Sequence, residues 1–129
     1  MADDDYDLTG TLIESDKPIA VFSGVDCANI PWYRMACDHL EDQLLPLHTW
    51  GRSAFGVSTE PQIADEPNLW RVVSGGDNNA ITFTPADVHA PTTLSSGEYV
   101  EFIYQGAFQV SGSDRLLLAG DRNSKVYNL

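Results

Sequence analysis

Basic residues are scarce in this sequence. Seven lysines and arginines stand against nineteen aspartates and glutamates, which leaves a formal net charge of −12 over 129 residues. The summed field of such a chain repels phosphate backbones and anionic lipid headgroups. We therefore expect no nucleic acid partner, and we interpret the acidic balance mainly as a source of solubility.

Long apolar runs are missing as well. No stretch approaches the roughly 18 apolar residues of a membrane-spanning helix, so we expect no direct membrane insertion. The N-terminus, Met1-Ala2 followed by three aspartates, lacks the basic and then apolar start of a signal peptide. Because residues 121–129 contain no clear closing element, we expect the sequence to be a piece of a larger secreted or cell-surface protein.

Cysteine is rare, with Cys27 and Cys37 as its two occurrences, ten positions apart. That spacing is not typical of a zinc knuckle, and no further cysteines exist to complete one. The alternatives are two free buried thiols or one disulfide, and we favour the disulfide. It would close a short loop, stabilise the fold by roughly 2–3 kcal/mol and indicate an oxidising compartment.

The motifs of common enzyme classes are also missing. Gly75-Gly76 is not followed by the helix pattern of a phosphate-binding loop, and no G-x-S-x-G sequence is present. A cysteine nucleophile needs a free thiolate beside a histidine, which conflicts with pairing of the two cysteines. We therefore predict that the chain is not an enzyme and has no catalytic residues.

Metal sites have little support in the sequence. His39 and His48, with Asp38, form the alternative of a metal-assisted site, but their spacing is not that of one helix face and Pro46 intervenes. Oxygen-rich segments at 3–5 and 77–79 do not follow the calcium-loop pattern. We expect no cofactor and no metal ligand, with calcium as the remaining alternative.

The sequence does contain the composition of a folded domain, with a hydrophobic fraction of 43% and three tryptophans. Its length predicts one domain over residues 1–129. Residues 18–22 are apolar throughout and predict a strand buried on both faces. Asp38 with Glu41 three residues later resembles a helix-capping box, and Pro46 ends the pattern. We therefore predict a helix of two turns, with His39 in its first turn.

The second half of the chain consists of short strand candidates separated by turn residues. They lie at 54–57, 69–74, 80–84, 98–104, 106–110, 115–119 and 126–127. The turn at 75–79 predicts a hairpin between its neighbouring strands, and 111–114 predicts another turn. The pattern indicates an all-β fold, an antiparallel β-sandwich or jelly-roll-like domain, with one short helix after a disulfide-closed loop.

Trp32, Tyr33 and Arg34 lie between the two cysteines. Aromatic side chains in a constrained loop lose little entropy on contact, so they make good binding anchors. The alternative is that Trp32 folds back as part of a small satellite core. We name these three residues the candidate binding loop, with Asp38 and His39 beside it as a helix cap and possible polar site.

The densest motif lies in residues 17–51. It consists of K-P-I-A-V-F-S-G at 17–24, C-A at 27–28, C-D-H-L at 37–40, Q-L at 43–44, P at 46 and T-W-G at 49–51. This pattern resembles the N-terminal domain of the IgG Fc-binding protein family, including its bacterial surface-protein relatives. The resemblance covers about 35 residues densely and the rest loosely. Asp42-Gln43 stands where the family often has E-Q.

The resemblance implies a secreted or cell-surface β domain, a Cys27–Cys37 disulfide and no catalysis. We expect a non-catalytic extracellular binding or adhesion module, whose partner is a protein or glycan ligand or a neighbouring domain of the same chain. A structural spacer or assembly domain of a surface protein is the main alternative, and a metal-assisted enzyme site near His39 is another. Antibody binding is not carried over, because no residue here matches a known Fc contact.

Overall fold

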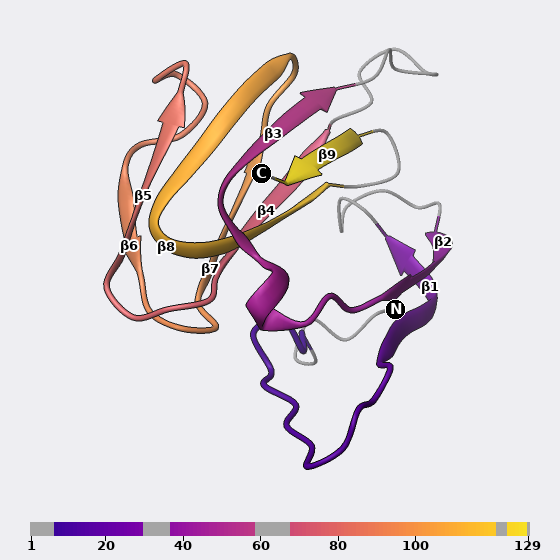
Figure 1. Cartoon of the computed structure of the whole chain (residues 1–129). Helices are drawn as coiled ribbons and strands as arrows, with labels where there is room; N and C mark the ends of the chain where they lie inside the picture. The colour runs from indigo at the N-terminus through magenta and orange to yellow at the C-terminus, as the bar shows by residue number, and fades with distance from the viewer. Residues whose placement is uncertain (1–6, 30–36, 59–67, 121–123, 129) are drawn as a thin grey trace.

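The computed structural model describes residues 7–29, 37–58, 68–120 and 124–128 (Figure 1). The described residues form nine strands and one short 3-10 helix, η2, which spans Leu47–Thr49. The strands are β1 (Phe22–Asn29), β2 (Cys37–Gln43), β3 (Gly51–Ser58), β4 (Leu69–Ser74), β5 (Asn79–Thr84), β6 (Thr92–Leu94), β7 (Tyr99–Ile103), β8 (Ala107–Gly120) and β9 (Ser124–Asn128).

Seven strands form one antiparallel sheet that is organised around β8. The first half of β8 lies between β3 and β5, and its second half pairs with β4, which in turn pairs with β7. β6 and β9 extend the sheet beyond β5 and β3. Because β8 bends between its two halves (Figure 1), β4 and β7 fold over β3 and β5. The body is therefore one curled sheet, rather than the two separate sheets of a sandwich.

The core fills the space inside the curl. Alternation along β5 buries Ile81 and Phe83, while Thr82 and Thr84 face solvent, as period-two patterning predicts. Trp70 of β4 packs edge-on against Phe108 of β8 at 4.9 Å between ring centroids. Phe83 and Phe102 pack similarly across the curl at 5.2 Å. These aromatic contacts hold the two halves of the sheet together.

Asn79 supports the bend of β8 from inside. Its side chain is fully buried, and its amide nitrogen donates to the carbonyl of Arg115 at 2.9 Å and to Ser74 Oγ at 3.1 Å. Its Oδ1 accepts the backbone N–H of Asp114 at 2.8 Å. The backbone groups that the bend withdraws from the strand ladder thus find partners on one side chain, as buried polar groups require.

The all-β, antiparallel class is confirmed, and strands lie where the patterns at 54–57, 69–74, 80–84 and 98–104 predict them. Two predictions in this half are wrong. β4 and β5 do not pair with each other: the connection at 75–78 carries the chain from one half of the curl to the other. Residues 111–114 do not separate two strands, because Asn79 lets β8 bend there without ending.

The predictions for the first third of the chain are mostly wrong. Residues 18–20 form no strand, and the strand that follows, β1, begins at Phe22 and is largely exposed. The predicted helix is instead strand β2, so Asp38 is not a helix cap and His39 is not a helical residue. Two isolated helical turns are marginal in water, whereas residues 37–43 form an antiparallel ladder with β1 that has one irregularity, between Val25 and Ala28.

Candidate functional site

β1 and β2 form a two-stranded sheet of their own, separate from the sheet that builds the body. The register runs from Phe22 opposite Gln43 to Asn29 opposite Cys37, with an irregularity between Val25 and Ala28. We call β1, β2 and the residues between them the hairpin. Trp32, Tyr33 and Arg34, the candidate binding loop, belong to the connection between these two strands and lie outside the described residues.

The two cysteines lie at the end of the hairpin ladder that adjoins this connection. Cys27 is on β1, is exposed and is disulfide-bonded. Cys37 opens β2, where its backbone is opposite Asn29, one position from the pair Ala28 and Asp38. The side chain of Cys37 lies outside the description, so the Cys27–Cys37 pairing stays a prediction.

His39 lies on β2 among carboxylates of the hairpin. Its Nε2 is 3.4 Å from Glu41 Oε2 and its Nδ1 is 3.8 Å from Asp26 Oδ1. The ring is 59% exposed, so water screens both interactions. Residues 7–29, 37–58, 68–120 and 124–128 contain no group of three or more histidine, cysteine or acidic residues placed to hold a metal ion. The structure therefore adds nothing in favour of the metal-assisted site near His39.

The oxygen-rich segment 77–79, the alternative calcium site, uses its side chains in hydrogen bonds within the domain. Asp77 Oδ1 accepts the backbone N–H of Ser96 at 3.0 Å, and the side chain of Asn79 is used at the bend of β8. The segment is the connection between β4 and β5, with Asn78 at a φ of 52°. Asparagine tolerates this left-handed conformation better than most residues. Residues 3–5, the other oxygen-rich segment, lie outside the description.

The hairpin and the residues next to it expose large apolar side chains. Phe22 is 61% exposed and Leu45 is 52% exposed, whereas the core residues of the body are almost completely buried. Ile19, Val25 and Leu44 are exposed in the same way. Leu44 lies opposite Val21, because its backbone N–H donates to Val21 O at 2.9 Å just beyond the Phe22–Gln43 pair. Since side chains alternate along a strand, Val25 and Leu44 share one face of the ladder and Phe22 lies on the other. We call Phe22, Val25, Leu44 and Leu45 the apolar hairpin surface.

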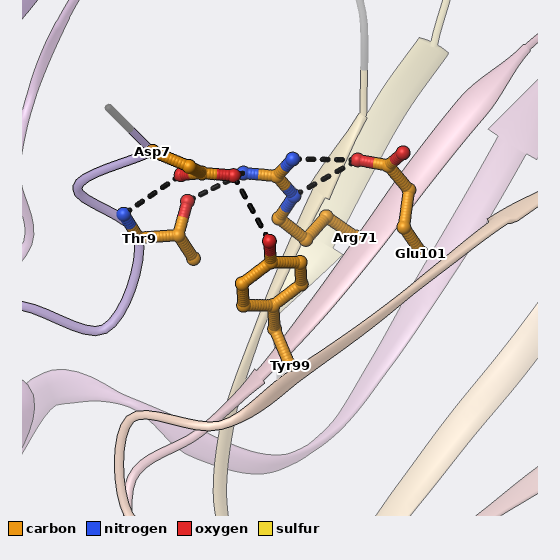
Figure 2. A network of polar contacts seen from close by, with 5 residues as sticks. All are labelled: Asp7, Thr9, Arg71, Tyr99 and Glu101. Atoms are coloured by element: carbon orange, nitrogen blue, oxygen red, sulfur yellow. Dashed lines mark hydrogen bonds and ion pairs between the residues drawn. The ribbon is translucent and has the colours of Figure 1, made fainter. Parts of the chain in front are cut away.

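A second polar site lies on the outer face of β4 and β7 (Figure 2). Arg71 of β4 donates to Glu101 of β7, from Nη2 at 2.6 Å and from Nε at 3.1 Å. Its guanidinium carbon lies 4.4 Å from the centre of the Tyr99 ring. Arg71 Nη1 meets Asp7 Oδ2 at 2.9 Å and donates to Thr9 Oγ1, while the Tyr99 hydroxyl donates to Asp7 at 3.0 Å. Five polar residues from three separate parts of the chain are thus joined.

The electrostatics of this cluster favour its charged form. Partial burial raises the pKa of the Asp7 carboxyl, but hydrogen bonds from Thr9 and Tyr99 and the charge of Arg71 outweigh that effect, so the pKa lies below its ordinary value. The hydrogen bond that the Tyr99 hydroxyl donates to Asp7 raises the pKa of Tyr99. Burial lowers the pKa of Arg71, and its carboxylate partners, Glu101 first, raise it on balance. Sequence reasoning missed this site, since 64 positions separate Asp7 from Arg71.

The fold and these sites define an all-β antiparallel domain with a separate, exposed hairpin. The chain belongs to the IgGFc binding protein family, whose model matches residues 2–120. It is similar to the human IgGFc-binding protein, with 28% identity over 97 residues. That match covers 74% of this chain and about 2% of the length of the human protein. No solved structure matches the chain. No helix in the described part of the chain is long and apolar enough to cross a membrane.

Proposed function

We propose that this domain is a non-catalytic extracellular module that binds a protein ligand through the hairpin. The observation that carries the proposal is the apolar hairpin surface, which lies outside the core of a domain whose family is named for protein binding. Adhesion of a cell surface or of a larger assembly is the role that such a module would serve.

Burial of the apolar hairpin surface would supply the binding free energy. Covering a phenylalanine or leucine side chain contributes about 1.5–3 kcal/mol. Val25 and Leu44 lie on the same face of the ladder, so one partner surface can cover both. Trp32 and Tyr33, predicted anchors in the connection between β1 and β2, would add to the same contact. A Cys27–Cys37 bond would hold the ends of that connection together and reduce the entropy lost on binding.

Charge would select among protein partners. Asp26, Glu41 and Asp42 lie on the hairpin, and the chain as a whole carries −12. A partner with lysines or arginines around an apolar patch would be steered toward this surface, and an acidic one would be repelled. Association should therefore be faster at low ionic strength, because salt screens exposed charges over about 8 Å at 0.15 M.

Binding measured on immobilised candidates tests this function. The first candidate is the Fc fragment of IgG, because the human relative is named for it. A glycan array and other extracellular proteins complete the panel. We expect the double variant Val25→Ser/Leu44→Ser to lose at least tenfold in affinity for any protein that binds, since two anchors on one face are removed.

Ile103→Ser is the matched control, because Ile103 is 52% exposed on β7, away from the hairpin. Equal losses for both variants would place the contact elsewhere. A panel on which no protein binds, or turnover of a substrate in a hydrolase screen, would overturn the proposed function.

A structural spacer or assembly domain is the second candidate, favoured by one observation. The chain spans about 2% of the length of its human relative, so a domain of this kind can occupy a small part of a long protein. This candidate predicts that the apolar hairpin surface meets the adjacent domain of the same protein. A tandem pair in which amide exchange at β1 and β2 equals that of the isolated domain would contradict it.

A further inference from the structure

We propose that Arg71 and Tyr99 form a receptor for an Asp-x-Thr segment, and that the segment bound there, Asp7–Thr9, can be exchanged between two copies of the chain. The ligand of this receptor is thus the N-terminal arm of a second copy. We use the name N-terminal arm for residues 7–20. This site lies on the outer face of β4 and β7, so it is distinct from the hairpin that carries the proposed function.

The receptor is formed by the body alone. Arg71 and Glu101 are directly paired in the β4–β7 ladder, and Glu101 accepts from both Nε and Nη2 of Arg71. The Tyr99 ring supports the guanidinium on its face at 4.4 Å, a cation–π distance. These contacts fix the side chain and leave Nη1 for the arm. An empty receptor would therefore keep its geometry, which reduces the free energy cost of binding.

The arm supplies a matching ligand. Asp7 accepts from Arg71 Nη1 and from the Tyr99 hydroxyl through Oδ2, and its Oδ1 accepts the backbone N–H of Thr9 at 2.9 Å. This local turn presents the Thr9 hydroxyl oxygen to the same guanidinium (Figure 2). A carboxylate followed two residues later by a hydroxyl is thus the chemistry that the receptor recognises.

A close backbone approach completes the fit. A Cβ at Gly10 would lie 2.0 Å from Gly97 O, and one at Gly97 would lie 2.8 Å from Gly10 O. Both residues also have a positive φ, 86° at Gly10 and 81° at Gly97, which glycine adopts without strain. The turn that follows Thr9 therefore sits directly on the β6–β7 connection.

The rest of the arm is weakly attached. Every residue from 7 to 20 is exposed except Thr9, which is half-buried. Its leucines, Leu8 and Leu12, are 73% and 68% exposed, so apolar burial does not hold the arm on the body. Beyond the receptor the arm runs as an open loop away from the strands before it enters β1 (Figure 1). A long exposed segment of this kind can reach a neighbouring copy.

Exchange preserves every contact of the arm, because a second copy offers the same receptor. The copies lose only the advantage of intramolecular binding, for which effective concentrations are of millimolar order. Two isolated chains would therefore exchange arms mainly at comparable concentrations. Copies that are held side by side, for example in a larger assembly, would do so readily. In such an assembly the receptor would connect one domain to an identical neighbouring domain.

Complementation between two full-length variants tests the proposal. Asp7→Ala leaves the receptor intact and removes the ligand carboxylate, whereas Arg71→Gln removes the receptor and leaves the arm. We expect each variant alone to sediment as a monomer. An equimolar mixture at about 1 mM, the scale of the effective concentration, should contain a one-to-one dimer. Asp16→Ala mixed with Arg52→Gln is the matched control, since both residues lie outside the receptor contacts and the mixture should behave as the wild type does.

A mixture that sediments as the sum of its monomers would overturn the proposal, and so would a dimer formed by Asp7→Ala alone. A second measurement does not depend on the folding of Arg71→Gln. A labelled peptide of residues 3–13 should bind the Asp7→Ala chain about tenfold more tightly than the wild type, whose own arm competes for the receptor. Equal affinity for the two chains would exclude the receptor as the binding site.

Discussion

Asn79→Ala is expected to be among the most destabilising single substitutions in the body. The variant removes a fully buried amide that bonds Ser74, Asp114 and Arg115 at the bend of β8. Asp114 N–H and the Asp114 carbonyl would lose these bonds, whereas the Arg115 carbonyl would keep the bond that it accepts from the Gly75 N–H. Each buried polar group left without a partner costs about 1–3 kcal/mol. Because some of these groups can form new hydrogen bonds with water or with one another, we expect the free energy of unfolding to fall by about 3–5 kcal/mol.

Such a loss is a large share of the roughly 5–15 kcal/mol by which small domains are stable. Urea denaturation followed by tryptophan fluorescence would measure it, since Trp70 lies in the core and β4 pairs with the second half of β8. Thr82→Ala is the matched control, because Thr82 is on the same strand but faces solvent. It should cost under about 1 kcal/mol. If Asn79→Ala costs no more than this control, the bend of β8 does not depend on the Asn79 side chain.

Three further predictions follow from other features. Gly56→Ala should destabilise the body by about 1–3 kcal/mol, because the new Cβ would lie 2.4 Å from the Phe108 ring; an unchanged urea midpoint would contradict this. Reduction of the predicted Cys27–Cys37 bond should remove roughly 2–3 kcal/mol from the hairpin, which amide exchange would detect as faster exchange in β1 and β2 with β8 unaffected. Identical exchange with and without reductant would count against the bond. The pKa of Asp7 is lowered in the folded chain, so its stabilising effect is present above the ordinary value of 3.8 and is lost as the pH falls through the folded pKa. NMR titration of the Thr9 backbone N–H, which donates to Asp7 Oδ1, should show this bond breaking as the pH falls through the folded pKa, below 3.8; a midpoint at or above 3.8 would refute that.

Strands in which apolar, buried positions alternate with polar, exposed ones were predictable from the sequence. The segment 80–84 alternates apolar and polar residues, and β5 buries Ile81 and Phe83 as that pattern requires. Which strands pair was not predictable. The turn at 75–78 has the residues of a hairpin turn, but its partner strands are chosen by β8, whose bend depends on a contact between Asn79 and residues 35 or 36 positions away.

The N-terminal third was predicted poorly because its apolar residues do not enter the core. A run such as 18–22 indicates burial only when another element covers it, and Phe22 is instead exposed. The segment 38–44 satisfies two patterns at once. Leu40 and Leu44 match a helix face, yet the backbone forms a ladder with β1. Long-range pairing decided between them, and no local signal reports it.

One candidate site could be proposed from local sequence, and the other could not. Trp32, Tyr33 and Arg34 were proposed from local composition, and they belong to the connection between two strands that a ladder brings together. The Arg71 receptor had no local signal, because its ligand comes from the start of the chain and its support from β7. An ion pair between residues this far apart in the sequence can be recognised only after the pairing of the strands is known.

The central place of β8 has a consequence for biosynthesis. β3, β4 and β5 all hydrogen-bond to β8, which is made after them and ends at Gly120. A chain leaving the ribosome thus carries three strands with open edges until almost the whole domain has emerged. Sheets built on such distant pairings form slowly, and their open edges are prone to join other chains. The nascent domain should therefore depend on chaperones during this interval more than a domain built from consecutive hairpins would.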